Sequence, residues 1–574
     1  MGGLESHVLS APSLGTSSGA NSTLTLNEPE HPVDGNRLAS NNKDHKVQLS
    51  DQTNLLPTKK LIVCFLGLSL CSLISQLDQF VTATSLSSIS ADFDAGAISS
   101  WVPTAYLLTS TCVTPLYGRF SDIFGRKTML LVALAVLVSG NISAGFADSI
   151  MEVIISRGVS GAGGGAIVTL AQIVMSDIVS LRERGKYQAI SASVNLLGVG
   201  IGPVVGGAIA QNAGWRLILV KWCFWFICPI AFCAAAVVIF VLPLKPVQGN
   251  VKEKLLVIDF LGSTLTLVAC TLILLPLIWG GVTFPWNSPV LIGTLMGGLA
   301  TTGLFILWEM KYAKLPIVPM HIFKSSTVCG VYIGSVVTGM ITLCTMNYLP
   351  QFFQTALGYS PIRSGVFLIP VLASQLVTNQ VSIIILVGYA IWSIACGIFS
   401  TVTPKTPVGL LVFYMLLSGL GSGSTLQTAT IAAQASVPRK DMATVTAFRG
   451  FLRLLGGALG LAIASAMINN SLRSEMQSLN ISEATIRSVI DKPALLRSSP
   501  SALGFSNDLA TAILYNGYIK GFGRMFIFSA GMSAAAFFTS IWLVKETNLD
   551  REDDEERKQE AAASAEDSEK PRDN

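Results

Sequence analysis

Long apolar stretches separated by short polar segments make up most of the chain. A helix needs about 20 mostly apolar residues to cross the hydrocarbon core of a bilayer. Continuous apolar runs fit helices better than the alternating strands of a membrane barrel. The pattern predicts an all-α polytopic membrane protein with about 14 transmembrane helices, at residues 61–86, 98–117, 128–147, 150–176, 187–210, 222–243, 258–280, 289–308, 327–350, 364–381, 384–403, 408–435, 442–468 and 522–544.

Residues 364–403 fit this pattern least well. The stretch has to hold two helices, yet the polar residues at 378–380 are its only break, and no basic loop separates its halves. Two spans of about 20 residues barely fit there. If only one of them crosses the membrane, the topology of every later helix is inverted.

Composition supports a membrane protein and excludes several other classes. Only 13% of the 574 residues are charged, against about 25% in soluble proteins. The formal net charge is +4, and the basic residues form no cluster typical of nucleic-acid binding. The 10 cysteines lie in apolar stretches without CxxC or Cys–His spacing, so we interpret them as core residues and expect no metal. The sequence shows no pattern of a catalytic nucleophile with a general base and no phosphate-binding loop, so we expect that the protein is not an enzyme.

The loop charges predict the orientation. Lys and Arg recur in alternate loops, at 119–127, 182–186, 245–254, 311–324 and 439–440, with the loop inside 364–403 as the exception, whereas the loops near Asp92 and Asp148 have none. Such a bias places the basic loops and both chain ends in the cytosol. The segment at 469–521 then faces outward, and Asn480, followed by Ile481 and Ser482, is a possible glycosylation acceptor.

A few charged residues fall within the predicted helices, where a charge is costly. Asp78 lies late in the first helix, and a carboxylate there suits reversible protonation; it could also hydrogen-bond helix ends near the outer interface. Arg157 begins the fourth helix and could pair with a carboxylate or extend to the interface. Arg449 and Arg453 share one helix face and could bind an anionic group or extend toward the cytosol.

Uncharged polar side chains within the helices mark a possible substrate cavity. Some of them could instead hydrogen-bond between helices. The candidates are Gln172, Asn195, Asn347, Gln351 and Gln427.

Glycines recur every four residues on the fifth helix, at Gly198, Gly202 and Gly206, followed by Gly207. Small residues at this spacing let another helix approach closely. Pro203 lies within the same stripe and would bend the helix. The stripe therefore predicts either static packing or a pivot for a moving bundle.

The segment between the second and third predicted helices resembles the signature loop of the major facilitator superfamily. The resemblance rests on Gly118, Asp122, Gly125, Arg126 and Lys127 in the sequence GRFSDIFGRK. Asp122 is expected to pair with Arg126, and Gly118 to permit close helix approach. The resemblance implies that this cluster holds the cytosolic side closed while the carrier opens outward.

Three further segments resemble motifs of the fungal fourteen-span drug:proton antiporters. They are the helix-1 motif at Asp78, the helix-4 motif beginning at Arg157, and the antiporter motif from Gly198 to Gly207 with Pro203. The resemblance implies a major facilitator fold, in which two six-helix bundles flank two linking helices. It also implies a proton-coupling role for Asp78 and Arg157.

The predicted domains follow from this resemblance and from the polar tails. We expect a disordered cytosolic tail at 1–59, an N-terminal bundle at 60–245, a linker with two extra helices at 246–325, a C-terminal bundle at 326–545 and a charged cytosolic tail at 546–574. Two departures from the family pattern bear on activity. Residues 217–221 look inserted, and the loop expected near 380–384 is missing.

The main functional hypothesis is a proton-coupled antiporter that exports drugs, toxins or hydrophobic metabolites. We expect a monomeric glycoprotein in the lipid bilayer of the plasma membrane, with the vacuolar membrane as the second choice. Its partner would be a small amphipathic substrate, and no cofactor besides the proton gradient is expected. An alternative is proton-coupled transport of siderophores, or of basic amino acids into the vacuole. A transport-incompetent sensor is disfavoured because the tails contain no recognisable signalling domain. A channel is disfavoured because the sequence contains no filter motif.

Overall fold

The computed structural model describes residues 58–93, 98, 101–181, 183–212, 224–242, 254, 258–280, 284–313, 315–359, 361–380, 385–491, 495–498 and 500–545. These residues all belong to one compact unit, Leu49–Asn574. The unit Met1–Gln48, residues 1–57 of the tail predicted at 1–59, and the tail predicted at 546–574 lie outside the described residues, as do the unusual segments at 217–221 and 381–384. The last two residues of the predicted N-terminal tail already belong to the first helix, which begins at Thr58.

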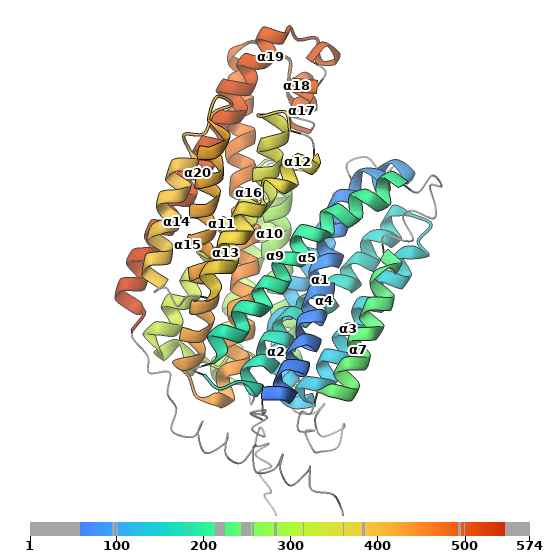
Figure 1. Ribbon diagram of the computed structural model, residues 1–574, viewed down its shortest axis with the longest axis vertical. Helices are drawn as coiled ribbons and strands as arrows, with labels where there is room; N and C mark the ends of the chain where they lie inside the picture. The colour runs from blue at the N-terminus through green and yellow to red at the C-terminus, as the bar shows by residue number, and fades with distance from the viewer. Residues whose placement is uncertain are drawn as a thin grey trace, which may run out of the picture. The chain divides into compact units, whose positions relative to one another are not determined.

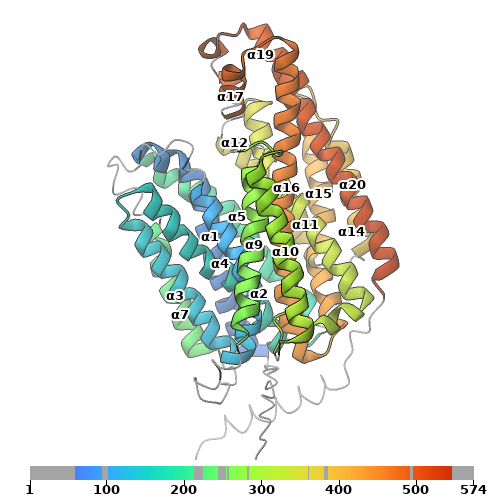
Figure 2. The same ribbon diagram turned by 180° about the vertical axis from the view of Figure 1, so that it is seen from behind.

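Helices account for nearly all of the described chain (Figures 1 and 2). Each predicted apolar stretch contains one of them, because continuous apolar sequence in lipid satisfies its backbone only within a helix. They are α1 (Thr58–Asp92), α2 (Trp101–Phe124), α3 (Arg126–Gly145), α4 (Ile150–Ile178), α5 (Arg184–Asn212), α7 (Ile227–Val241), α9 (Phe260–Trp279), α10 (Pro289–Lys311), α11 (Ser326–Thr355), α13 (Ile369–Gln380), α14 (Ile385–Phe399), α15 (Val408–Ala435), α16 (Met442–Ser478) and α20 (Lys520–Leu543).

Within the described residues, 9 helices are long and apolar enough to cross a membrane by length and composition alone. Among the remaining helices that correspond to a predicted span, α13 is the shortest, with 12 residues. It follows α12 (Pro361–Val366), and backbone hydrogen bonds from Phe367 to Arg363 and from Leu372 to Leu368 bridge the two. The difficult stretch at 364–403 therefore contains two helical segments. The first, α13, packs against α15 and α5, and the second, α14, packs against α15 and α20.

The N-terminal bundle is built by α1, α2, α3, α4, α5 and α7, with its apolar core between α1, α3, α4 and α7. Gly198 and Gly202 place α5 directly against α1, where added methyl groups would press on Gln76 and Phe80. This close approach is what the glycine stripe predicted. Pro203, Gly206 and Gly207 are described only as part of the helical backbone of α5.

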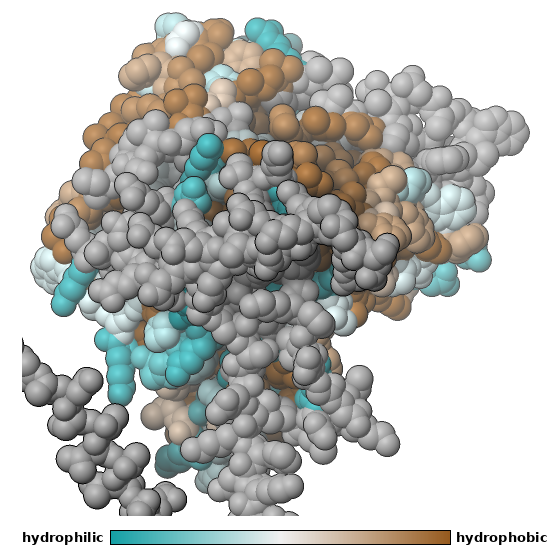
Figure 3. All heavy atoms as spheres, turned by 60° about the horizontal axis from the view of Figure 1, so that its bottom comes forward, coloured by the Kyte–Doolittle hydropathy of each residue, from teal (hydrophilic) through white to brown (hydrophobic). Residues whose placement is uncertain are grey.

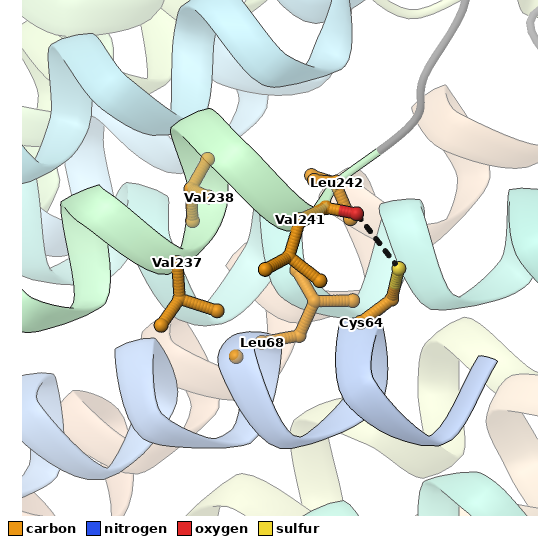
Figure 4. Close-up of a pocket in the computed structure, with 7 residues that line it drawn as sticks. Cys64, Leu68, Val237, Val238, Val241 and Leu242 are labelled. Atoms are coloured by element: carbon orange, nitrogen blue, oxygen red, sulfur yellow. Dashed lines mark hydrogen bonds between the residues drawn. The ribbon is translucent and has the colours of Figure 1, made fainter. Parts of the chain in front are cut away.

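A small apolar crevice lies between α1 and α7 in the same bundle (Figure 4). The Cys64 thiol bonds the Val241 carbonyl there at 3.5 Å. Its other labelled lining residues are aliphatic, so the crevice is a packing seam and offers no polar group to a substrate. The lining residues are Cys64, Gly67, Leu68, Val237, Val238, Val241 and Leu242.

The C-terminal bundle contains α11, α13, α14, α15, α16 and α20. Gly456, Gly457 and Gly460 bring α16 against Val336 and Met340 of α11. The linking helices α9 and α10 pair with each other, and α9 also contacts α2 and α16, so the linker packs against both bundles. Much of α10 is exposed, as expected for a helix that faces lipid.

The helix α16 is longer than the predicted span, which ended at 468. It has 37 residues and is about 55 Å long, well beyond the hydrocarbon thickness of about 30 Å. The predicted outward loop at 469–521 is also largely helical in its described part. It contains α17 (Glu483–Asp491), α18 (Leu495–Ser498), α19 (Asn507–Ile513) and the π-helix η5 (Leu514–Ile519). Figure 1 shows α17, α18 and α19 gathered at one end.

This segment folds against the C-terminal bundle because it carries apolar residues at helical spacing. Ile486, Val489 and Ile513 are fully buried and join a core that includes Phe353 and Leu472. The predicted glycosylation site, Asn480, lies on an exposed turn between α16 and α17 with a φ of 56°.

We define the signature end of the molecule as the end at which α2 ends and α3 begins. The helices α1, α5, α11 and α16 start there, and α4, α15 and α20 finish there, because successive long helices run in opposite directions. Figure 3 tilts this end toward the viewer: among the described residues in view, several hydrophilic ones lie along its lower edge, whereas apolar ones cover much of the flanks. This distribution fits a protein whose sides contact lipid.

Candidate functional site

A buried ion pair connects α1 and α4 in the N-terminal bundle. The Arg157 side chain is 0% exposed and Asp78 is 2% exposed. One terminal nitrogen of Arg157 donates to both Asp78 carboxylate oxygens, at 2.9 and 3.0 Å, and the other donates to the Asp78 carbonyl at 3.2 Å. The structure therefore brings together the two residues predicted to couple to protons.

Aromatic rings enclose the guanidinium of this pair. The Arg157 side chain lies 4.5 Å from the ring centroid of Tyr106 on α2 and 5.7 Å from that of Phe224. The Tyr106 hydroxyl donates to the Ser75 carbonyl at 3.3 Å. Such an environment excludes water, so the charge of Arg157 must be balanced by Asp78 and by the ring faces.

Glu152 is the carboxylate nearest to Arg157 in the sequence, but it has a different role. Glu152 accepts the backbone N–H of Asp148 at 2.9 Å, and its own N–H bonds the side chain of Ser149, which caps α4. These are the interactions of a helix N-terminus. Glu152 therefore stabilises the start of α4, and the partner of Arg157 comes from a different helix.

A second charged cluster lies at the signature end. Arg126 bonds Asp122 at 2.6 Å, Asp177 at 2.8 Å and the Ser121 hydroxyl at 2.7 Å. The expected pair of Asp122 and Arg126 is thus present, and Asp177, at the end of α4, joins it. Sequence analysis missed Asp177 as a partner because it lies 51 residues from Arg126.

The signature segment is mostly helical rather than a loop. α2 continues through Phe124, and Gly125 alone separates it from α3. Gly125 has a φ of 98°, in the left-handed region that side chains disfavour. A glycine is required there because the chain must reverse within one residue to bring Arg126 back toward Asp122.

Lys127 connects α3 to the end of α7. Its ammonium donates to the carbonyls of Ile239 at 2.7 Å and Leu242 at 3.2 Å. These carbonyls belong to the last turn of α7, where a cation is favoured. The residue therefore packs the N-terminal bundle together at the signature end.

Replacing Lys127 with methionine is expected to lower the free energy of unfolding by about 1 kcal/mol or less, since a single cation at a partly exposed helix end contributes no more. The measurement is thermal unfolding of the purified protein. Lys520, an exposed lysine inside the continuous helical stretch from η5 into α20, provides the matched Lys520→Met control. Equal stability of the two variants would contradict this role for Lys127.

The two bundles are joined by hydrogen bonds at the signature end. Arg184, at the start of α5, is 1% exposed. It donates to the Gln434 side chain of α15 at 3.2 Å and contacts the Met442 sulfur of α16 at 3.6 Å. It also bonds the Val179 carbonyl within its own bundle at 3.2 Å. The contacts of Arg184 with Gln434 and Met442 therefore run from one bundle to the other.

Glycines allow close packing at the same interface. A methyl group on Gly118 of α2 would overlap the Ala447 methyl of α16. A methyl group on Gly185 of α5 would lie 3.5 Å from Ile431 of α15, an ordinary contact. A glycine at position 118 is therefore needed for the bundles to approach this closely, whereas an alanine would fit at position 185.

The predicted cavity residues are distributed over both bundles. Gln172, Asn195, Gln351 and Gln427 are half-buried, and Asn347 is exposed and donates to the Leu343 carbonyl of its own helix at 2.9 Å. Within the described residues, no recorded hydrogen bond or ion pair connects these five side chains with one another. Their role in binding stays a prediction.

The two arginines of α16 differ in their surroundings. Arg449 is 5% exposed and bonds the Thr430 hydroxyl and, at 2.8 Å, the Leu426 carbonyl, both on α15. Arg453 is half-buried. Within the described part of the chain, the structure records no ion pair for either arginine and no side-chain hydrogen bond for Arg453.

Comparison with known proteins assigns this arrangement to a family. The Major Facilitator Superfamily profile matches residues 68–461, more than half of the chain. The chain belongs to the major facilitator superfamily. It is therefore a multi-pass membrane transporter for small molecules and not an enzyme, and the resemblance seen in its motifs is confirmed.

Curated relatives within this superfamily are exporters by name. Citrate exporter 1 of Yarrowia lipolytica is 31% identical over 513 residues, which cover 87% of this chain and 75% of the relative. The efflux pump dotC of Dothistroma septosporum is 31% identical over 434 residues, covering 74% of each chain. The MFS-type efflux pump LUC4 of a Fusarium species is 31% identical over 439 residues, covering 74% of this chain and 77% of the relative.

Solved structures support the superfamily fold. The proton:xylose symporter XylE aligns with a TM-score of 0.52 at 14% identity, covering 86% of this chain and 97% of that chain. The human organic anion transporter MFSD10 aligns with a TM-score of 0.52 at 13% identity, covering 84% and 99%. The major facilitator fold predicted from the sequence is thereby confirmed.

Proposed function

We propose that this transporter is a proton-coupled exporter of small amphipathic or hydrophobic compounds. The observation that carries the proposal is the buried pair of Asp78 and Arg157, with 2.9 Å between carboxylate and guanidinium. A carboxylate enclosed in the membrane domain can be neutralised by a single proton. Protonation of Asp78 would release the Arg157 guanidinium and so change the packing of α1 against α4.

The signature end supplies the gate in this proposal. The Arg126 cluster holds α2, α3 and α4 together, and Arg184 attaches this assembly to α15 and α16. Opening this end requires Arg184 to leave Gln434, and closing it requires Gly118 to meet Ala447. With the signature end in the cytosol, as the basic loops favour, the described conformation is closed on the side from which an exporter collects its substrate.

The names of the relatives favour export over uptake. Two are efflux pumps and one is a citrate exporter. We propose the plasma membrane as the location, a monomeric state, Asn480 as a glycosylation site, and the proton gradient in place of a cofactor. Transport of basic amino acids is disfavoured, because the arginines of α16 would repel a cationic substrate.

Replacing Asp78 with asparagine is expected to abolish proton-dependent transport while the protein still reaches the membrane. The amide keeps the size of the side chain but takes up no proton in the physiological range. The assay is export of an accumulating compound from vesicles with and without an imposed pH gradient. Deletion and overexpression, followed by accumulation measurements across drugs, citrate and endogenous toxins, first identify that compound.

The matched control is Asp508→Asn, on an exposed position of α19. It should transport like the unchanged protein. Full proton-dependent transport by Asp78→Asn would refute the coupling role. Accumulation of every compound in the overexpressing strain at the level of the deletion strain would refute export altogether. Imaging of a tagged chain distinguishes the plasma membrane from the vacuolar membrane.

A further inference from the structure

The C-terminal bundle contains two positive charges that take no part in the Asp78–Arg157 pair. Arg449 and Arg453 are one helical turn apart on α16, so their side chains lie on the same face. Like charges at this spacing destabilise a helix. By contrast with Arg157, neither has a carboxylate partner among the described residues. A buried charge without a counter-ion is costly, so an anion from outside the chain would stabilise this site.

The depth of these residues argues against a role at the membrane surface. α16 begins at Met442, so Arg449 and Arg453 lie about 10 Å and 16 Å along it, given a rise of about 1.5 Å per residue. The hydrocarbon core is about 30 Å thick. With the hydrocarbon core taken to begin at Met442, the start of the predicted span, Arg453 lies near the middle of the membrane, too deep for easy contact with lipid headgroups.

Arg449 is already held in place by its neighbours. Its bonds to Thr430 and to the Leu426 carbonyl fix the guanidinium against α15. These acceptors are neutral, so they orient the charge without cancelling it. The Arg453 side chain, one turn deeper, keeps its donors available.

A third polar group points to a ligand at this site. The Tyr332 side chain of α11 is 4% exposed, and its hydroxyl has no hydrogen-bond partner in the described structure. Its ring lies 5.2 Å from that of Phe448, the residue that precedes Arg449 on α16. A buried hydroxyl without a partner costs free energy unless it meets a ligand or water.

The same helix lies at the boundary between the two bundles. Gly450, between the two arginines, faces Thr114 of α2 and Thr169 of α4, with 3.7 Å from an added methyl group to either side chain. Substrates of this type of transporter bind between the bundles near the midplane. The arginine pair is therefore adjacent to the place where a substrate has to pass.

We propose that Arg449 and Arg453, with the Tyr332 hydroxyl, form an anion site that binds the carboxylate of an organic-acid substrate. This inference rests on the proposed export function and narrows its substrate class. A guanidinium donates two parallel hydrogen bonds to a carboxylate, which adds orientation to charge attraction. Arg453 would make this contact, Arg449 would contribute positive charge from a fixed position, and Tyr332 would add a hydroxyl donor.

The test measures thermal unfolding of the full-length protein in phosphatidylcholine nanodiscs, at constant pH and ionic strength. Three matched probe pairs are titrated: acetate with acetamide, benzoate with benzamide, and citrate with its trimethyl ester. We expect at least one carboxylate to raise the unfolding midpoint, and its neutral counterpart to leave the midpoint unchanged, because only a ligand that binds the folded state stabilises it.

Arg453→Gln should weaken the apparent affinity for that carboxylate by about tenfold or more, since hydrogen bonds to a charged group contribute about 1.5–3 kcal/mol. Arg453→Lys should retain part of the affinity, because it keeps the charge and loses the two-pronged geometry. Arg473→Gln is the control: this arginine lies on the same helix and pairs with Glu483 at 3.4 Å, with 43% of its side chain exposed.

The proposal is overturned if no carboxylate stabilises the protein more than its neutral partner, or if Arg453→Gln keeps the full response. Stabilisation by phosphatidylglycerol nanodiscs alone would assign the arginines to lipid instead. The unfolding measurement needs no proton gradient, so its result is independent of the coupling test. Asp78→Asn can keep full proton-dependent transport while a carboxylate still stabilises the protein through Arg453. In that case the export mechanism fails and the anion site stands.

Discussion

Replacing Gly118 with alanine is expected to lower transport by about tenfold or more. In the described conformation the added methyl group would overlap the Ala447 methyl on the facing bundle. Overpacking of this kind costs about 1–3 kcal/mol, and about 1.4 kcal/mol changes a conformational equilibrium tenfold. The substitution therefore favours molecules that are open at the signature end, and it slows every cycle that must pass through closure.

Both the defect and its cause can be measured. Export of the transported compound reports the rate. Spin labels at the exposed residues Lys186 and Lys440, which lie at the signature end of opposite bundles, report the distance between the bundles. We expect a longer mean distance in Gly118→Ala than in the unchanged protein.

A second substitution separates this overlap from other effects of the added methyl group. Ala447→Gly removes the methyl that Gly118→Ala would meet, so the double variant should regain transport and the original label distance. Gly185→Ala lies at the same interface and has room for its methyl, so it should behave like the unchanged protein. A double variant as impaired as Gly118→Ala would show that the interface does not limit transport.

The helices were predictable because their cause is local. A run of about 20 apolar residues specifies a helix in lipid whatever its neighbours are. The same reasoning failed at 469–521, where polar composition suggested a loop. Ile486 and Val489 of α17 bury themselves in the C-terminal bundle. That burial depends on the tertiary surface offered by α11 and α16, which no sequence window contains.

The residues of the site were predictable one by one, but most of their partners were not. Costly intramembrane charges singled out Asp78 and Arg157, which are 79 residues apart, and the structure joins them. The contact of Arg184 with Gln434 spans 250 residues. The sequence indicates no contact between these two residues, because nothing in either local segment points to the other. Only the assembly of the two bundles reveals that these side chains meet.

Replacing Arg157 with glutamine is expected to lower the free energy of unfolding by about 3–5 kcal/mol, the usual cost of breaking a buried ion pair from one side. The Asp78 carboxylate would keep its charge at 2% exposure and lose its guanidinium. It would regain stability by taking up a proton, so the loss should be largest at high pH and smaller in acid. Thermal unfolding of the purified protein across pH measures both effects.

The double variant Asp78→Asn with Arg157→Gln removes both charges and should recover most of the lost stability, because no unpaired charge remains. If Arg157 serves only to hold the fold, this variant should also regain proton-dependent export. If the pair couples transport to protons, it should fold, reach the membrane and show no response to the pH gradient. Arg473→Gln controls for the loss of an exposed arginine. An Arg157→Gln protein as stable as this control would contradict the assignment of Arg157 and Asp78 as a buried pair.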